Sequence, residues 1–256
     1  MNPKLESFQR LLSIMDDLRE KCPWDKKQTT KSLRNLSIEE VYELSDAILK
    51  NDPKGVKEEL GDLFLHLIFY AKIGEEEGNF DVADVLNAVC DKLIHRHPHI
   101  YGDVQADTEE EVLKNWEQLK LKEGKKSVLE GVPSSMPAIN KAFRLQEKTA
   151  KVGFEWEKIE DVWEKVEEEK QELEAAVKSK NPDQIEDEFG DLLFALINYA
   201  RYLKIDPEAA LERTNQKFKK RFEFIEKRAK DLGKEMDKMS LEEMDEIWNE
   251  AKNLTK

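Results

Sequence analysis

Two acidic segments of this chain each occur twice, at a constant separation along the sequence. The run SIEEVYELSDAI, which begins at Ser37, is matched by VEEEKQELEAAV from Val166. The run EELGDLFLHLIFYAK from Glu58 is matched by DEFGDLLFALINYAR from Asp187, and in both cases the second copy begins 129 residues after the first. Self-similarity at a fixed spacing means that one structural unit is repeated, so we expect two similar domains in tandem.

Apolar residues recur at helical spacing in both copies, and no run alternates between apolar and polar residues as a half-buried strand would. We therefore predict an all-α fold with four to five helices in each repeat. Aspartates precede Pro53 and Val82, where their side chains suit an N-cap position, and proline is favoured at the first helical position. In the first repeat the predicted helices span residues 2–21, 38–50, 53–78, 82–97 and 108–122.

A segment without helical periodicity separates the repeats. Residues 123–137, EGKKSVLEGVPSSMP, contain two glycines and two prolines, which are the residues that most often interrupt regular structure. We interpret this segment as a linker between an N-terminal helical domain, residues 1–122, and a C-terminal helical domain, residues 138–256.

The formal net charge of −14 restricts the partners of this chain. Nucleic acids and anionic membranes bind basic surfaces, so neither is expected here, although a small anionic ligand remains possible if a metal ion or a local basic cluster receives it. No apolar run approaches the length of a membrane span, and the N-terminus lacks the apolar core of a signal peptide. Cys22 and Cys90 stand far apart without metal-ligand spacing, so we expect a reducing, cytoplasmic setting.

Four acidic residues in each repeat have a mirrored arrangement. Glu40 and Glu43 share one helix face because they are three residues apart, and Glu59 and Asp62 do the same on the next helix. Residue 51 is the midpoint of both Glu43/Glu59 and Glu40/Asp62. An antiparallel hairpin folded there places the two pairs at the same level, on helices roughly 8–10 Å apart. The second repeat has the same arrangement about residue 180, with Glu169, Glu172, Glu188 and Asp191.

Four converging carboxylates repel one another and raise one another's pKa values, and a divalent cation removes that conflict. Oxygen ligands favour Mg²⁺, with Mn²⁺ as a substitute, over Zn²⁺, and Mg²⁺ usually keeps coordination positions for water and phosphate. A single E-x-x-E pair in a chain so rich in glutamate would be only a solvated helix face. Because the mirrored geometry occurs twice, we predict one metal site in each repeat.

The helix that carries the second acidic pair continues into an almost wholly apolar run in each repeat. Within residues 63–71 only His66 is neither apolar nor aromatic, and within residues 192–200 only Asn198 is. A helix that is apolar on all sides packs in a bundle core or against another subunit. We therefore expect a homodimer; the alternative is that the two repeats of one chain pack on each other.

These motifs together resemble those of the MazG family of nucleoside triphosphate pyrophosphohydrolases. The resemblance covers nearly the whole chain and rests on the tandem E-x-x-E and E-x-x-D motifs, CPWD from Cys22, GVPSSMP in the linker and VGFEW from Val152. It implies an all-α NTP pyrophosphatase fold, a dimer, dependence on Mg²⁺, and cleavage of NTP or dNTP to nucleoside monophosphate and pyrophosphate. The cellular role would be clearing or regulating the nucleotide pool.

The resemblance also implies roles for individual residues. The eight acids of the two mirrored sets would be metal ligands and catalytic residues, and one carboxylate would accept a proton from the attacking water. The substrate-binding residues would be Lys165, Glu168, Asn215, Lys217, Arg221 and Trp248 in the second repeat, with Lys92 and Arg96 in the first. The alternative is that these residues have only structural roles. The basic side chains would then be solvated or lie at helix ends, and Trp248 would only pack an amphipathic helix.

The two repeats are not equivalent in sequence. Lys165 corresponds to Leu36, and Asn215 corresponds to Cys90, so the first repeat lacks a cation and an amide that the second has. We therefore expect the second repeat to be the main catalytic site.

Other functional classes fit these residues less well. A non-enzymatic helical adaptor would need the acids only for solubility, and substitution of Glu172 or Asp191 would separate it from an enzyme. A di-iron carboxylate bundle normally requires Glu-x-x-His motifs, and none occurs. Three histidines, His95, His97 and His99, alternate near a helix end, where cations complement the helix dipole as readily as they would bind a transition metal.

Overall fold

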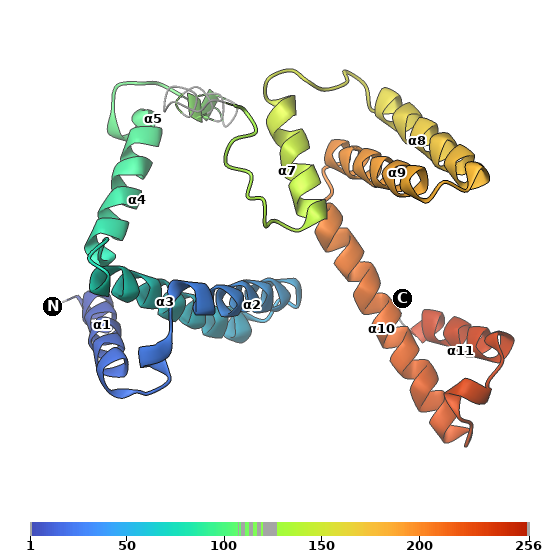
Figure 1. Ribbon diagram of the computed structural model, residues 1–256, viewed down its shortest axis with the longest axis horizontal. Coiled ribbons are helices and arrows are strands. Elements are labelled where there is room, and N and C mark those ends of the chain that lie inside the picture. The colour runs from blue at the N-terminus through green and yellow to red at the C-terminus, as the bar shows by residue number, and fades with distance from the viewer. Residues whose placement is uncertain are drawn as a thin grey trace. The chain divides into compact units, whose positions relative to one another are not determined.

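The computed structural model describes residues 2–106, 108, 111, 112, 115, 116, 119 and 127–254. These residues form helices and their connections, with no strand among them, so the all-α prediction is confirmed (Figure 1). The chain divides into two compact units, Met1–Lys120 and Leu121–Lys256. Most of the helix predicted over residues 108–122, and the first residues of the predicted linker, lie outside the described part of the chain.

The first unit is built around an antiparallel helical hairpin, α2 and α3 (Figure 1). Helix α1 packs on α3 and on a short 3₁₀ helix, η1, while α4 follows α3 and contacts it. The elements are α1 (Pro3–Lys21), η1 (Asp25–Lys27), α2 (Thr30–Leu49), α3 (Pro53–Glu76), α4 (Val82–Arg96) and α5 (Pro98–Tyr101).

Helix α2 begins at Thr30, not at Ile38 as predicted. Thr29 caps it, since its hydroxyl accepts from the Ser32 amide at 3.1 Å and the Ser32 hydroxyl accepts from the Thr29 amide at 2.9 Å. This reciprocal cap satisfies two backbone donors that a helix start leaves open. Ser37 therefore lies inside the helix, where its hydroxyl donates to the Leu33 carbonyl at 3.0 Å.

The second unit contains the equivalent hairpin, α8 and α9, followed by another hairpin of α10 and α11 (Figure 1). Helix α7 packs on α9, as α1 packs on α3 in the first unit. The elements are α7 (Ala138–Ala150), α8 (Ile159–Ser179), α9 (Pro182–Tyr202), α10 (Pro207–Asp231), η2 (Met236–Lys238) and α11 (Leu241–Leu254).

Both site-bearing hairpins turn where the mirror spacing predicts. Asn51 and Lys180, the two midpoints, each adopt a left-handed conformation, with φ of 53° and 58°. The next residue caps the following helix in both cases, because Asp52 accepts from the Lys54 amide and Asn181 from the Asp183 amide. Proline then occupies the first helical turn. The same local chemistry thus sets the register of both hairpins.

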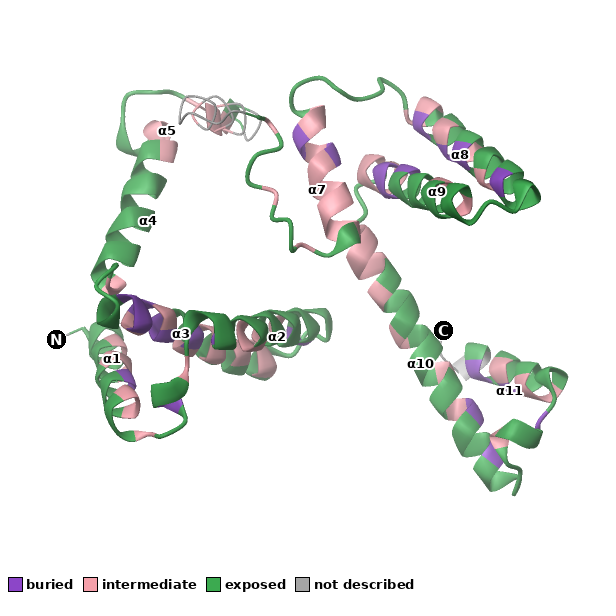
Figure 2. Ribbon diagram, viewed as in Figure 1, coloured by how far each residue is buried: buried purple, intermediate pink, exposed green. Residues whose placement is uncertain are grey.

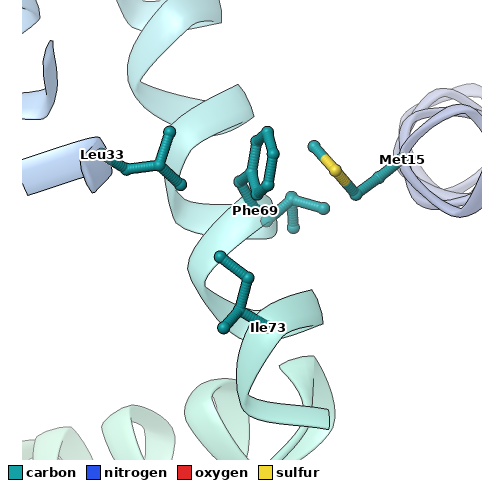
Figure 3. Close-up of a cluster of buried hydrophobic side chains, with 5 residues drawn as sticks. Met15, Leu33, Phe69 and Ile73 are labelled. Atoms are coloured by element: carbon teal, nitrogen blue, oxygen red, sulfur yellow. The ribbon is translucent and has the colours of Figure 1, made fainter. Parts of the chain in front are cut away.

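The core of the first unit lies where α1, α2 and the C-terminal half of α3 meet. Figure 3 shows Met15 from α1, Leu33 from α2, and Phe69 and Ile73 from α3 in this cluster. Met15 and Leu33 are each only 1% exposed. Fully burying a side chain of this size contributes roughly 1.5–3 kcal/mol, so this cluster anchors one end of the α2–α3 hairpin.

One face of each central helix stays exposed within its unit (Figure 2). On α3 the exposed apolar residues follow helical spacing, and the residues 129 positions later on α9 do the same. They are Leu60, Phe64 and Leu67 on α3 and Phe189, Leu193 and Leu196 on α9, with exposed fractions from 40% to 62%. Within the described residues, no helix has the length and apolar character needed to cross a bilayer.

Candidate functional site

Each site-bearing hairpin brings three of its four predicted acids together. Glu40, Glu43 and Glu59 each offer a carboxylate oxygen that lies within 4.8 Å of the other two, and Glu169, Glu172 and Glu188 do the same in the second unit. The first two acids of each trio come from one helix and the third from its partner. The hairpin register therefore brings together three of the four acids that the spacing predicts to converge in each repeat.

The first trio is electrostatically strained. The pKa of Glu40 is raised, first by its partial burial and then by the negative charges of Asp62 and Glu43. The pKa of Glu59 is raised in the same way, by desolvation and by Glu43, Glu40 and Asp62. Mutual repulsion of this kind is what a bound divalent cation would relieve.

The second trio differs because a lysine is already present. Lys165 lies one turn before Glu169 on α8, with its Nζ atom 2.6 Å from Glu169 Oε1 and 2.8 Å from Glu168 Oε1. These two carboxylates raise the pKa of Lys165, so it stays charged. Glu169 itself is buried. The pKa of Glu172 is raised by desolvation, by a hydrogen bond with Glu169 and by neighbouring charges, and Lys165 opposes that rise.

The fourth acid of each set stands outside its trio. Asp62 is close enough to Glu40 and Glu59 to raise the pKa of both. Asp191 lines a cavity beside the second trio, together with Glu169. Both aspartates therefore lie at the edge of their trios, and their assignment as metal ligands stays a prediction.

In the sequence, His66 only interrupts an apolar run, but the structure places it against the first trio. His66 is buried, and its Nε2 atom lies 3.8 Å from Glu40 Oε1. The Ser37 hydroxyl lies 2.9 Å from His66 Nδ1 and 2.8 Å from the Tyr70 hydroxyl, which fixes the ring. Burial lowers the pKa of His66, so the imidazole is neutral near pH 7. Its position one turn after Asp62 was the available signal.

A cavity that the sequence motifs did not predict adjoins the second trio. Its volume is about 350 Å³, within the range of about 300–1,000 Å³ that small-molecule sites occupy. Its walls come from α7, α8, α9, the segment between α7 and α8, and Leu129 before α7. Lys165, Glu169 and Asp191 are among the residues that line it. Asn198, the polar interruption of the second apolar run, is in its wall. That interruption was the one hint in the sequence.

The remaining predicted substrate residues lie on other helices. Asn215, Lys217 and Arg221 are on α10, and none of them is among the residues that line the cavity. Trp248 on α11 packs against Phe218, with ring centroids 5.3 Å apart, and lies beneath the Arg221 guanidinium at 5.5 Å. In the first unit, Lys92 and Arg96 are on α4. Their roles in substrate binding stay predictions.

The donor set of both trios suits a hard cation. Carboxylate oxygens are the ligands that Mg²⁺ and Mn²⁺ prefer, and no histidine or cysteine sulfur belongs to either trio among the described residues. Glu40, Glu43 and Glu59, or Glu169, Glu172 and Glu188, would hold such an ion. The protein is therefore an all-α tandem-domain protein in which each domain carries one glutamate trio on a helical hairpin.

Comparisons with known proteins identify the class further. The family model of the MazG nucleotide pyrophosphohydrolase domain matches residues 28–101 and residues 157–224. The nucleoside triphosphate pyrophosphohydrolase of Escherichia coli K12 is 41% identical over 257 residues, covering 97% of this chain and 98% of that protein. The nucleoside triphosphate pyrophosphohydrolase/pyrophosphatase MazG of Thermotoga maritima is 43% identical over 250 residues, covering 96% of this chain and 95% of that protein.

A third relative is longer than this chain. The Bacillus subtilis protein YabN is 48% identical over 252 residues, which cover 96% of this chain, but this chain spans only 51% of YabN. The chain belongs to the MazG nucleotide pyrophosphohydrolase family, with two copies of its domain. The resemblance found in the sequence motifs is thereby confirmed.

Proposed function

We propose that this chain hydrolyses nucleoside triphosphates, NTP or dNTP, to nucleoside monophosphate and pyrophosphate, with Mg²⁺ held by the glutamate trios. The observation that carries the proposal is the glutamate trio, which occurs once in each repeat. In each trio the carboxylate oxygens lie within 4.8 Å of one another. The names of the Escherichia coli and Thermotoga maritima relatives support the reaction. Attack at the α-phosphorus is the reaction that releases pyrophosphate.

The residues of the second trio and Lys165 have different roles in the proposed reaction. When bound, Mg²⁺ would neutralise phosphate charge and make a coordinated water more acidic. Glu169, Glu172 and Glu188 would hold that ion, and a carboxylate of the set would accept the proton of the attacking water. Lys165 stays charged beside Glu169. It is available to contact the triphosphate once a metal ion shares the negative charge of Glu169.

The second unit is proposed as the main catalytic site. Its trio has a lysine at hydrogen-bond distance and an adjoining cavity, whereas the first trio has buried, neutral His66 beside Glu40. A triphosphate carries several negative charges, so a permanent cation beside the trio favours its binding.

A product assay tests the reaction directly. Full-length protein is incubated with Mg²⁺ and each NTP and dNTP in turn, and the products are separated by anion-exchange chromatography. The expected products are nucleoside monophosphate and pyrophosphate in equal amounts. Release of nucleoside diphosphate and orthophosphate would overturn the proposed bond cleavage, and the absence of any product would favour the adaptor alternative.

We also propose that the protein is a homodimer. The exposed apolar stripe of α3 and its equivalent on α9 support this, because contiguous apolar surface of this kind marks an interaction site. Multi-angle light scattering should give twice the mass of one chain. Leu67→Asp, which places a charge on the stripe at a position 62% exposed within its unit, should shift the mass toward one chain, while Glu77→Asp away from the stripe should not.

A reducing cytoplasm is proposed as the setting, and clearing or regulation of the nucleotide pool as the role. Cys22 and Cys90 are both unpaired, which is consistent with a reducing compartment. Labelling of both thiols in freshly lysed cells, without prior reduction, is the expected result.

A further inference from the structure

The residues that line the cavity beside the second trio are of two chemical kinds. Lys165, Glu169 and Asp191 are charged and belong to the proposed phosphate and metal site. The rest of the wall is largely apolar and aromatic. It includes Phe154 and Trp156 from the segment after α7, Val162 from α8, and Phe194 and Ala195 from α9. A ligand with a charged tail and a flat, weakly polar head matches this arrangement.

One polar group in this wall has an unfilled hydrogen-bonding position. Gln146 on α7 is only 6% exposed and lines the cavity. Its Nε2 atom donates to the Phe194 carbonyl at 2.8 Å, which sets the orientation of the amide. Its Oε1 atom is buried and has no hydrogen-bond partner. An acceptor left unsatisfied in this way is unfavourable in a buried wall, so a ligand that supplied an N–H would remove that cost.

Other polar groups of the wall are already engaged. Asn198 Oδ1 accepts from Arg201 Nε at 3.1 Å, and Arg201 Nη1 in turn pairs with Glu155 at 3.0 Å. This chain of contacts ties α9 to the segment that carries Phe154 and Trp156. It therefore holds the segment of Phe154 and Trp156 against α9, whereas the acceptor of Gln146 has no partner within the protein.

The corresponding positions of the first unit are filled by side chains. Leu33, Leu36 and Phe69 stand 129 residues before Val162, Lys165 and Asn198, and all three belong to or pack against the buried cluster of Figure 3. His66 occupies the position of Ala195. The apolar space beside the first trio is therefore occupied by the protein's own leucine and phenylalanine side chains.

From these observations we infer that the cavity is the nucleobase subsite of the second unit, and that Gln146 Oε1 accepts a hydrogen bond from an N–H group of the base. This inference rests on the proposed function, since the phosphates are taken to lie at the trio. Aromatic walls accept any base, because every base has a π face. Each of the four common bases also carries an N–H group on its pairing edge. Gln146 would therefore tolerate different bases while rejecting a base without that donor.

The test compares ATP with purine riboside triphosphate, which has the same ring system without the exocyclic amino group. In the wild-type protein the KM of purine riboside triphosphate should exceed that of ATP by about 3- to 10-fold, as expected for one lost hydrogen bond to a buried acceptor. In Gln146→Leu this ratio should fall to about one, with kcat for ATP changed much less than KM. Gln171→Leu, an exposed position on α8, is the matched control and should keep the wild-type ratio.

A second variant tests the cavity itself without removing Gln146. Ala195→Leu adds bulk at a buried position of the wall and should raise the KM of every NTP while leaving Mn²⁺ affinity, measured by calorimetry, unchanged. Wild-type KM values in this variant, or equal KM values for the two substrates in wild-type protein, would overturn the inference.

The inference and the proposed function can fail separately. If no NTP yields monophosphate and pyrophosphate, the proposed function fails, and the cavity is then tested by calorimetric binding of AMP and purine riboside monophosphate to protein with saturating Mg²⁺. Tighter binding of AMP that is lost in Gln146→Leu would support the subsite. Equal binding of the two, or none, would overturn it.

Discussion

The two repeats of this chain share one helical hairpin and one acidic trio, but they surround the trio differently. In the first unit, buried His66 contacts Glu40, and Leu33, Leu36 and Phe69 fill the space behind it. In the second unit, Lys165 contacts Glu169 and an open cavity occupies the equivalent region. The part of the repeat that would hold a metal ion has been kept, while the part that would hold the rest of a nucleotide has diverged.

This contrast separates two physical requirements of a site. Gathering carboxylates needs only a hairpin register, which a left-handed turn residue, an N-cap and a proline fix in both units. Accepting an organic ligand also needs unfilled apolar volume, which lowers stability because unfilled space forgoes packing contacts. In the first unit side chains fill the region beside the trio, and in the second unit that region stays open.

Removing carboxylates from one trio at a time should give the largest difference between the repeats. The double variant Glu169→Gln, Glu172→Gln should lower NTP hydrolysis by about 1,000-fold or more, because loss of a single electrostatic contact in an active site already costs 10²–10³-fold. The matched variant Glu40→Gln, Glu43→Gln should keep most of the activity. Initial rates of pyrophosphate release measure both.

Mn²⁺ titration calorimetry controls this comparison. Each double variant should bind one ion fewer per chain than the wild type, and circular dichroism should show unchanged helix content. Equal loss of activity in both double variants would show that the repeats work as one site, and would contradict the assignment of the second unit as the main one.

Truncating the core of the first unit should destabilise it strongly. Phe69 is 3% exposed within the cluster of Figure 3, so Phe69→Ala should lower the free energy of unfolding by about 3–5 kcal/mol. Phe64→Ala on the same helix, at a position 52% exposed within its unit, is the matched control and should cost much less in the monomeric state. Urea unfolding followed by fluorescence and circular dichroism measures the free energy of unfolding of both variants. A small loss in Phe69→Ala would mean that the neighbouring side chains move in to fill the cavity left by the phenyl ring.

The hairpins and trios were predictable from the sequence because they depend on spacing within about thirty residues. The acids are spaced symmetrically about residues 51 and 180, which predicts the register of each hairpin. An aspartate or asparagine before proline predicts the turn and the cap of the second helix. The start of α2 was placed too late because the Thr29 and Ser32 cap does not have the glutamate of the usual capping box.

The cavity and the His66 contact were not predictable in the same way. Gln146 reaches the cavity from α7, and its partner carbonyl is 48 residues away along the chain. Nothing in the local pattern of α7 shows which of its polar residues will be buried against α9. The contact of His66 with Glu40 likewise depends on how the side chains of α2 and α3 interleave, which the period of each helix does not specify alone.

Exchanging the cation between the repeats should have an intermediate effect. Lys165→Met keeps the length of the side chain but removes the charge, so the KM for ATP should rise by about 10-fold, the lower end expected for a hydrogen bond to a charged group. The reciprocal Leu36→Lys places a cation near Glu40 and should strengthen binding of the triphosphate to the first unit in the Glu169→Gln, Glu172→Gln background. Steady-state kinetics measures the first, and calorimetry with a non-hydrolysable ATP analogue measures the second. An unchanged KM in Lys165→Met would mean that the lysine serves only to neutralise Glu169.

The smallest expected effect is on the pH dependence of stability in metal-free protein. The folded-state pKa values of Glu40 and Glu59 are raised above the ordinary glutamate value of about 4.3. Between the ordinary and the raised pKa the folded state binds more protons than the unfolded state, so stability falls as pH rises through this window and stays lower above it. Glu59→Gln removes part of that repulsion and should raise the melting temperature at pH 7 in EDTA, with little change at pH 4.

The corresponding change in the second unit should be smaller. The pKa of Glu172 is also raised, but Lys165 opposes the rise, so the repulsion that Glu172→Gln can relieve is already partly neutralised. Scanning calorimetry of both variants in EDTA at pH 4 and pH 7 makes the comparison, and added Mg²⁺ should stabilise the wild type more than either variant. A larger gain for Glu172→Gln than for Glu59→Gln would contradict the view that the lysine of the second repeat balances its trio before any metal binds.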